Sequence, residues 1–329
     1  MGWPRGVCYG PDVQPTLSVV IPTHHRAWTL AQMIGPLLAD ESATEIVVVV
    51  DGMDAQTLAV LEAMPNAHRR LRWSVLEPNQ GLVRAKSHGI RLASGDVVLM
   101  LDDDVRLPAG LASGHLAHHQ QRDHLVVVGS MHVDLGLRRR VLGRVVARNY
   151  ERAYATDVAD YVLHPEGILD GLWASNVSMP TADLMAMQPE ILEYTMFAHE
   201  DKHLGLVAKR HGMTAVFDPS LAAEHLFMKD WPGMLRDAEA FGRAQRVLSE
   251  LHPQLGQFDA EGLPEPLNPL VARAVLASDR AYLQGPELAS LKAATWTSEA
   301  VGAHRTAERL AFAAAQIARR RGRRSTPTR

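Results

Sequence analysis

The chain has 329 residues, of which 47% are hydrophobic and 22% charged, a composition typical of a globular protein with a sizeable core. The formal net charge is −3 although arginines crowd the last eleven positions, so the body of the chain is acidic and nucleic acid is not an expected partner. Cys8 is the single cysteine, which excludes an intramolecular disulfide and a cysteine zinc cluster. Since no apolar run reaches about 18 residues and residues 1–5 lack a signal-peptide core, neither an integral membrane segment nor a signal peptide is expected, and the predicted location is cytoplasmic.

The first part of the chain alternates buried strands with helices. Residues 1–15 contain three prolines and are interpreted as an irregular lead-in. Strands are expected at 17–21, 45–50, 71–76, 97–101 and 125–128, and helices at 28–39, 55–64, 80–93 and 108–121. This alternation predicts parallel βαβ units, and therefore an α/β fold with a doubly wound, mostly parallel sheet covered by helices on both faces.

One stretch concentrates the expected chemistry. The apolar run 97–101 ends abruptly in the three carboxylates Asp102–Asp104. Because the carboxyl ends of parallel strands share one rim, Thr23 and Asp51 should lie on the same edge. Adjacent carboxylates repel one another, so a fold that keeps them together usually supplies a cation. Oxygen ligands favour a hard divalent cation such as Mg²⁺ or Mn²⁺. A solvated acidic turn before Pro108 is the alternative.

The pattern becomes less regular after residue 130. The polar and aromatic stretch 171–180 is interpreted as a ligand contact and not as a further strand. A helix is expected from Glu200 to His211, where Gly212 ends it, followed by a short strand at 214–217 that leads to His225.

The last hundred residues have a mostly helical pattern, broken by prolines. Helices are expected at 231–250, 268–283 and 286–319, which predicts a helical extension over 231–321 without chemistry of its own. Six arginines lie within the last eleven positions, and the basic tail 322–329 is expected to be disordered. An anionic lipid or acidic partner for this tail, and a homodimer contact through the helices, stay open.

Four short motifs occur in order, at spacings of about thirty residues: VVIPT at 19–23, VVDG at 49–52, NQGLVRAK at 79–86 and LDDD at 101–104. The ordered set resembles the inverting family 2 glycosyltransferases of the GT-A fold, which use nucleotide sugars. Glu200–Asp201 and His225 then fall where that family carries its base and a later metal ligand. The resemblance covers roughly residues 16–228.

The resemblance implies a metal-dependent glycosyltransferase, with Mn²⁺ or Mg²⁺ as cofactor. It would move a sugar from a nucleotide diphosphate sugar, with a UDP-sugar favoured, to an acceptor hydroxyl of unknown identity by single displacement. The implied catalytic domain covers residues 16–230, with a nucleotide-binding half at 16–130 and an acceptor-binding half at 131–230. The alternative function is a catalytically inactive scaffold or regulator that binds a nucleotide sugar.

The candidate site residues fall into four groups. The resemblance makes Asp201 the catalytic base, with Glu200 beside it, and gives the metal to Asp104 and His225. The residues assigned to the donor are Pro22, Thr23, Arg26, Asp51, Asn79, Gly81, Arg84, Lys86, Asp102 and Asp103. The acceptor is expected to contact Trp173, Ser175 and Asn176.

Structural interpretations stay open for several of these residues. Glu200–Asp201 also suits the favourable negative charge at a helix start. His225 is one of sixteen histidines and is equally explained by packing, and Arg84 and Lys86 suit solvated helix positions. A sugar-phosphate nucleotidyltransferase is disfavoured, because residues 22–26 lack the glycine-rich loop expected after its first strand.

Overall fold

The computed structural model describes residues 14–64, 69–120, 122–137, 139–255 and 286–325. The chain divides into two compact units. Unit 1 comprises 1–132, 155–196 and 200–226, and unit 2 comprises 133–154, 197–199 and 227–329. Within the described residues, no helix has both the length and the apolar character needed to cross a membrane.

Unit 1 is built on a mixed eight-stranded sheet in the order β3-β2-β1-β4-β7-β6-β8-β5. The strands are β1 (Leu17–Thr23), β2 (Ala43–Asp51), β3 (Leu71–Leu76), β4 (Val97–Leu101), β5 (Val105–Arg106), β6 (Leu125–Val133), β7 (Asn176–Pro180) and β8 (Thr214–His225). The first four strands run parallel, whereas β7 is antiparallel to both β4 and β6, and β5 is antiparallel to β8. The predicted α/β sheet is therefore confirmed in its parallel half.

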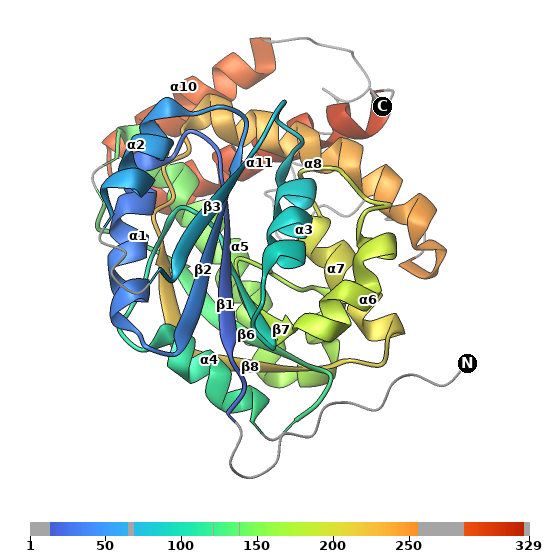
Figure 1. Ribbon diagram of the computed structural model, residues 1–329. Coiled ribbons are helices and arrows are strands. Elements are labelled where there is room, and N and C mark those ends of the chain that lie inside the picture. The colour runs from blue at the N-terminus through green and yellow to red at the C-terminus, as the bar shows by residue number, and fades with distance from the viewer. Residues whose placement is uncertain (1–13, 65–68, 121, 138, 256–285, 326–329) are drawn as a thin grey trace. The chain divides into compact units, whose positions relative to one another are not determined.

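Helices cover both faces of this sheet. They are α1 (Ala27–Ala39), α2 (Ala55–Ala63), α3 (Leu82–Leu92), α4 (Leu111–His119), η1 (Pro165–Asp170), α6 (Thr181–Ile191) and α7 (Glu200–Arg210). Figure 1 shows α1 and α2 on one side of β2 and α3 on the other. Apolar side chains of α3, α6 and α7 share one buried cluster with Val20, Val49 and Met100 of the strands. Such two-sided cover explains why the central strands are apolar along their length.

The interpretation of residues 171–180 as a non-strand segment is wrong. Residues Asn176–Pro180 form β7 in the middle of the sheet, paired with β4 from Val97 to Leu101. The polar residues of β7 are buried because histidines of α4 satisfy them: His115 bonds Asn176 at 2.9 Å, and both His115 and His119 bond Ser178 Oγ, at 3.0 and 2.8 Å. A strand that buries hydrogen-bonded polar side chains lacks the apolar run that identified the others.

Two further elements differ from expectation, one helix that was not predicted and one strand that is longer than predicted. Residues Val141–Leu163 form the helix α5, in a stretch where the sequence showed no regular pattern. The strand expected at 214–217 continues to His225 as β8. The extension matters for function, because it carries His225 to the register position opposite Val105, directly after the acidic residues that follow β4.

Unit 2 is helical. It contains the first part of α5, η2 (Pro253–Leu255) and the helices α8 (Trp231–Leu251), α10 (Pro286–Ala300) and α11 (His304–Arg324). The single helix expected at 286–319 is two helices, separated at Gly302, whose φ is +80°. Residues 322–324 continue α11 and are not disordered, whereas 326–329 and the helix expected at 268–283 lie outside the described residues.

Two glycines set the closest helix contact in unit 2. A Cβ at Gly242 of α8 would collide with the carbonyl oxygen of Arg319, and a Cβ at Gly322 of α11 would collide with that of Glu239. The remainder of this interface on α11 is rich in buried alanine, including Ala311, an apolar pattern that lets two helices pack with their backbones close together. Neither glycine has room for a side chain.

Candidate active site

The parallel strands bring the predicted donor residues to one edge of unit 1. Since β1 lies between β2 and β4, the residues that end or follow these strands, Thr23, Asp51 and Asp102, are neighbours along the rim. Thr23 and Asp51 are buried, with 3% and 5% of their surface exposed. Pro22 is part of β1 and is also buried.

Asp51 organises the loop that leads into α3. Its two carboxylate oxygens accept the backbone N–H groups of Gln80 and Gly81, at 2.7 and 2.8 Å. Asn79 donates its side-chain amide to the backbone oxygen of Asp51 at 2.9 Å. Gly81 has φ of +88°, which favours glycine at the residue before the helix. A carboxylate accepts up to about four hydrogen bonds, so Asp51 retains lone pairs for a ligand donor.

Asp104 lies between two groups that can bear positive charge. Arg26 Nη1 is 2.8 Å from Oδ2, and His225 Nε2 is 3.4 Å from Oδ1. Burial raises the pKa of Asp104, but His225 and Arg26 outweigh it, and the pKa falls below its ordinary range. For Asp103, burial and the neighbouring Asp104 raise the pKa to about 7. The two adjacent acids therefore differ, and Asp104 is the ionised one.

Lys86 joins the rim to helix α7. Its side chain, 9% exposed, places Nζ 3.3 Å from Asp102 Oδ1 and 3.9 Å from Asp201 Oδ1. Burial lowers the pKa of Lys86, but the two carboxylates outweigh it and raise that pKa. Arg84, two residues earlier on α3, is exposed. The structure thus brings only one of the two predicted helix cations into the acidic cluster.

Glu200 and Asp201 form the first turn of α7. Burial raises the pKa of Glu200, and the adjacent Asp201 raises it further. Burial also raises the pKa of Asp201, whose side chain is 22% exposed, while Lys86 opposes that rise. In this coupled pair, Glu200 is the acid that retains its proton, and Asp201, beside Lys86, is the one that ionises first.

The side chains around Asp104 fit a divalent cation that takes some of its ligands from the protein and the others from a substrate. Within the part of the chain that the structure describes, no group of three or more His, Cys, Asp or Glu side chains is arranged to hold a metal ion. Asp104 offers a carboxylate, the ligand type that suits Mn²⁺ or Mg²⁺, and His225 places an imidazole 3.4 Å from it. Such ions commonly take their other ligands from phosphate oxygens and water.

The three expected acceptor residues lie in different surroundings. Trp173 donates its indole N–H to Asp157 of α5 at 2.8 Å. Ser175 is 7% exposed, and its backbone oxygen accepts the N–H of Asp102 at 3.2 Å. Asn176 is 2% exposed and bonds Ser130 and Leu221 inside the sheet, so its predicted acceptor contact is replaced by a structural role.

Two residues near the site were not singled out from the sequence. His24 bonds the backbone oxygen of Asp51 through Nδ1 at 2.6 Å, and its N–H lies 3.4 Å from Asp103 Oδ2. Its place directly after VVIPT was the available signal. Asp157, the partner of Trp173, lies on α5, and no pattern in that stretch pointed to it.

The acid-lined rim of a mixed α/β sheet and the overall topology define a protein of the GT-A fold. The mannosyltransferase PcManGT from Pyrobaculum calidifontis, solved in complex with GDP-Man and Mn²⁺, superposes with a TM-score of 0.59 over 94% of this chain and 88% of its own, at 16% identity. At that identity the likeness concerns the fold alone.

Residues 18–170 match the family described as Glycosyl transferase family 2, the family that the motifs resemble. The uncharacterised glycosyltransferase YfnE of Bacillus subtilis (strain 168) is 28% identical over 114 residues, 34% of this chain and 29% of that protein. The succinoglycan biosynthesis protein ExoO of Rhizobium meliloti (strain 1021) is 35% identical over 94 residues, 28% and 26% of the two chains. The matched stretches span less than a third of these relatives.

The family match ends before several candidate residues. Glu200, Asp201 and His225 lie beyond residue 170, so their assignment depends on their positions in this structure. Lys86 links Asp201 to Asp102, and His225 contacts Asp104. Both links lead back to the acidic residues inside the matched segment.

Proposed function

We propose that this protein is a metal-dependent inverting glycosyltransferase that transfers a sugar from a nucleotide diphosphate sugar to an acceptor hydroxyl. The observation that carries the proposal is the gathering of two charged clusters around Asp102–Asp104. One is Asp104 with His225 and Arg26, and the other is Lys86 with Asp102 and Asp201. The first suits a cation and a diphosphate, and the second suits a proton acceptor.

The diphosphate of the donor is proposed to bind beside Asp104 and His225. A divalent cation held there would neutralise the charge that develops on the departing diphosphate. Arg26, which contacts Asp104 at 2.8 Å, adds a fixed positive charge beside the same phosphates. Thr23 and Asp51 are proposed to contact the nucleotide base, with the open lone pairs of Asp51 accepting an N–H of uracil. This pairing is the reason a UDP-sugar is the favoured donor.

Asp201 is the proposed general base. The acceptor hydroxyl attacks the anomeric carbon from the face opposite the diphosphate, its proton passes to the Asp201 carboxylate, and the bond to the diphosphate oxygen breaks. A single displacement of this kind inverts the anomeric centre. The raised pKa of Asp201 suits this role, because a base is most effective when its pKa approaches the working pH. Lys86 keeps the carboxylate ionised in its partly buried position.

The test is a calorimetric titration of the full chain with UDP, GDP and TDP, each with and without Mn²⁺. We expect Mn²⁺-dependent binding with UDP tightest. GDP is the essential comparison, because PcManGT was solved with GDP-Man. Tighter binding of GDP would overturn the UDP preference alone, and absence of binding by all three would overturn the donor site. Metal-dependent hydrolysis of the bound sugar nucleotide separates an enzyme from an inactive donor-binding scaffold.

A further inference from the structure

Unit 2 contains a cavity that the proposed reaction does not use. Its volume is about 620 Å³, within the range typical of small-molecule sites. It is lined by the start of α5, the segment that enters α8, and two residues of α10, Lys292 and Trp296. These two residues are four apart and therefore share one face of the helix. Every lining residue belongs to unit 2.

The charge on the cavity wall is strongly unbalanced. The lining includes four cations, Arg139, Arg140, Lys229 and Lys292, and a single carboxylate, Asp230. That carboxylate already caps α8 by accepting the N–H of Gly233 at 2.9 Å. A wall of this composition favours a ligand with more than one negative charge.

Two of the four cations, Arg140 and Lys292, remain available to a ligand. Lys229 already pairs with Asp237. Arg139 donates to two backbone oxygens, those of Phe227 at 2.9 Å and Leu137 at 3.1 Å, and its buried Nη2 has no hydrogen-bond partner within the described residues. Burial lowers the pKa of Arg139, and the charge of Asp134 only partly opposes this. Arg140 and Lys292 are exposed, and neither has an ion pair in the described part of the chain.

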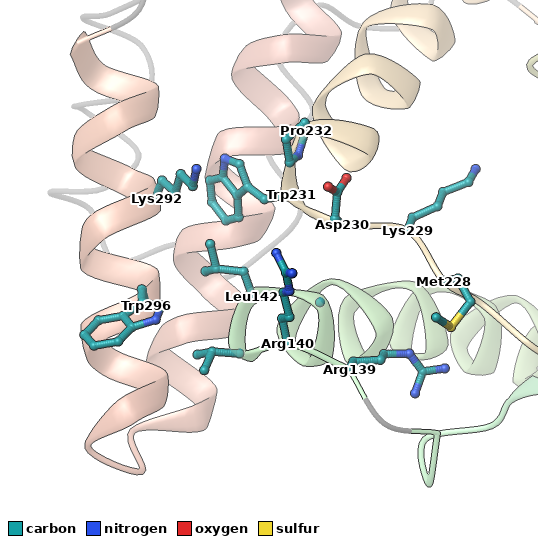
Figure 2. A pocket seen from close by; sticks show the side chains of 12 residues that line it. Arg139, Arg140, Leu142, Met228, Lys229, Asp230, Trp231, Pro232, Lys292 and Trp296 are labelled. Atoms are coloured by element: carbon teal, nitrogen blue, oxygen red, sulfur yellow. The ribbon is translucent and has the colours of Figure 1, made fainter.

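Large apolar side chains adjoin these cations. Trp231 is packed, with 3% of its surface exposed, whereas Trp296 and Met228 are 52% and 49% exposed. Figure 2 shows Trp296 on α10, the helix that also carries Lys292. Exposed tryptophan and methionine beside unpaired cations suit a ligand that is apolar at one end and anionic at the other.

We propose that this cavity binds an amphipathic phosphate monoester. Its phosphate is held by Arg140 and Lys292, since the guanidinium fork matches phosphate oxygens and a dianion balances both cations. Its apolar part lies against Trp231 and Trp296. The site is separate from the donor site and does not depend on the function proposed above. The same chemistry occurs in a soluble alkyl phosphate and in the headgroup of a phosphatidic acid membrane.

The experiment measures binding of octyl phosphate to the full chain by calorimetry, below the concentration at which the detergent forms micelles. Inorganic phosphate and octanol are the two half-ligands. Octyl phosphate should bind at least about tenfold more tightly than either, because only it occupies both ends of the cavity. Equal affinity for octanol would overturn the anionic end of the site, and equal affinity for inorganic phosphate would overturn the apolar end.

Variants locate the binding. Arg140→Gln combined with Lys292→Gln changes two exposed side chains, so the fold should be retained while octyl phosphate binds about tenfold more weakly or worse. Arg305→Gln, an exposed cation at the start of α11, is the matched control and should bind as the parent does. Unchanged affinity in the double variant would show that the ligand binds elsewhere.

Two further measurements identify the source of the ligand and test whether the cavity is independent of the donor site. Binding to phosphatidic acid vesicles, but not to phosphatidylcholine vesicles, with loss in the double variant, assigns the cavity to a lipid headgroup. Binding of octyl phosphate alone assigns it to a soluble ester. Asp104→Ala should leave octyl phosphate affinity unchanged, so failure of the donor site and failure of this cavity are distinguishable. A parallel loss in Asp104→Ala would contradict a separate site.

Discussion

Glu299 of unit 2 and Asp201 of unit 1 are partly or fully buried carboxylates whose pKa values shift in opposite directions. In unit 2, Glu299 and Glu308 have side chains 1% and 6% exposed, and both pair with Arg148, at 2.6 and 2.7 Å. Burial raises the pKa of Glu299, but Arg148 and His304 outweigh it, and that pKa falls below its ordinary value. In unit 1, the single Lys86 is shared between Asp102 and Asp201.

The pKa of Asp201 is consequently raised, although its side chain is more exposed than that of Glu299. Burial alone does not identify a functional acid. Glu299, which has several cationic partners, is held ionised, whereas Asp201, which shares Lys86 with Asp102, is poised to take a proton. The comparison predicts that substitutions in unit 2 change stability and that substitutions at the rim of unit 1 change chemistry.

The largest expected effect is on the base. Asp201→Asn should lower sugar transfer by about 10²–10⁴-fold, the usual contribution of a general base, while nucleotide affinity is retained. Stability should stay the same or rise, because a partly buried charge is removed. Steady-state rates together with nucleotide titration measure both. Near-normal transfer would move the base to Glu200 or to another group.

A comparable loss is expected at the cation site. Asp104→Ala should abolish Mn²⁺-dependent donor binding and lower turnover by about 10²–10³-fold or more, the scale seen when a group that stabilises transition-state charge is removed. Glu224→Gln is the matched control, since Glu224 adjoins His225 on β8 but pairs with Arg106. Equal losses in the two variants would indicate general damage to this edge.

The corresponding change in unit 2 should act on stability. Glu299→Gln leaves Arg148 with one carboxylate partner in place of two, and should lower the free energy of unfolding by about 2–3 kcal/mol. The value is below that of a fully buried pair because Arg148 is 25% exposed. Denaturant unfolding measures the change. A loss of transfer per folded molecule comparable to that of Asp201→Asn would remove the contrast between the units.

The glycine contact gives a second stability test. Gly242→Ala forces a methyl group against the backbone of Arg319 and should cost about 1–3 kcal/mol, as overpacking does. Gly35→Ala on α1 is the control, because a Cβ there meets nothing within 4 Å and alanine favours a helix by about 0.5–1 kcal/mol. Thermal unfolding should therefore shift in opposite directions. A shift of the same sign would disprove the tight contact.

The smallest effect concerns the histidines behind β7. Burial lowers the pKa of His115 to about 4 and of His119 to about 3. Below pH 6.5 these histidines bind protons in the unfolded chain but stay neutral in the folded chain. The free energy of unfolding therefore falls by about 1.4 kcal/mol per pH unit for each histidine as the pH decreases, until the pKa of the folded state is reached.

His119→Gln keeps a hydrogen-bonding group for Ser178 without titrating, and should reduce the loss of stability between pH 7 and pH 5. Urea midpoints at the two pH values measure this. His164→Gln, an exposed histidine that is 61% accessible, is the control and should leave the loss unchanged. A full parental loss in His119→Gln would exclude His119 as its source.

The local sequence determined much of unit 1. Apolar runs that end in turn or acidic residues predicted β1 to β4, and the shared edge of parallel strands then placed Thr23, Asp51 and Asp102 together. The ordered motifs predicted the family. These predictions are correct because each feature is encoded within a few neighbouring residues and does not depend on a distant partner.

Other features were decided by tertiary contacts. The polar strand β7 is buried because His115 and His119 of α4, about sixty residues earlier, satisfy its side chains. The helix α5 likewise shows no regular pattern to predict it. A pattern among neighbouring residues does not show which distant residues form hydrogen bonds with one another.

The two cations of α3 show the same limit within one helix. Arg84 and Lys86 are equivalent in the sequence, yet two residues of a helix turn a side chain through about 200°, and only Lys86 is buried. Because α3 packs on the sheet through the face that carries Lys86, this side chain lies beside Asp102 and Asp201. The sequence by itself determined which charges lie near the strand ends, and only the tertiary structure decided which of them meet, because pairing depends on the face that each element buries.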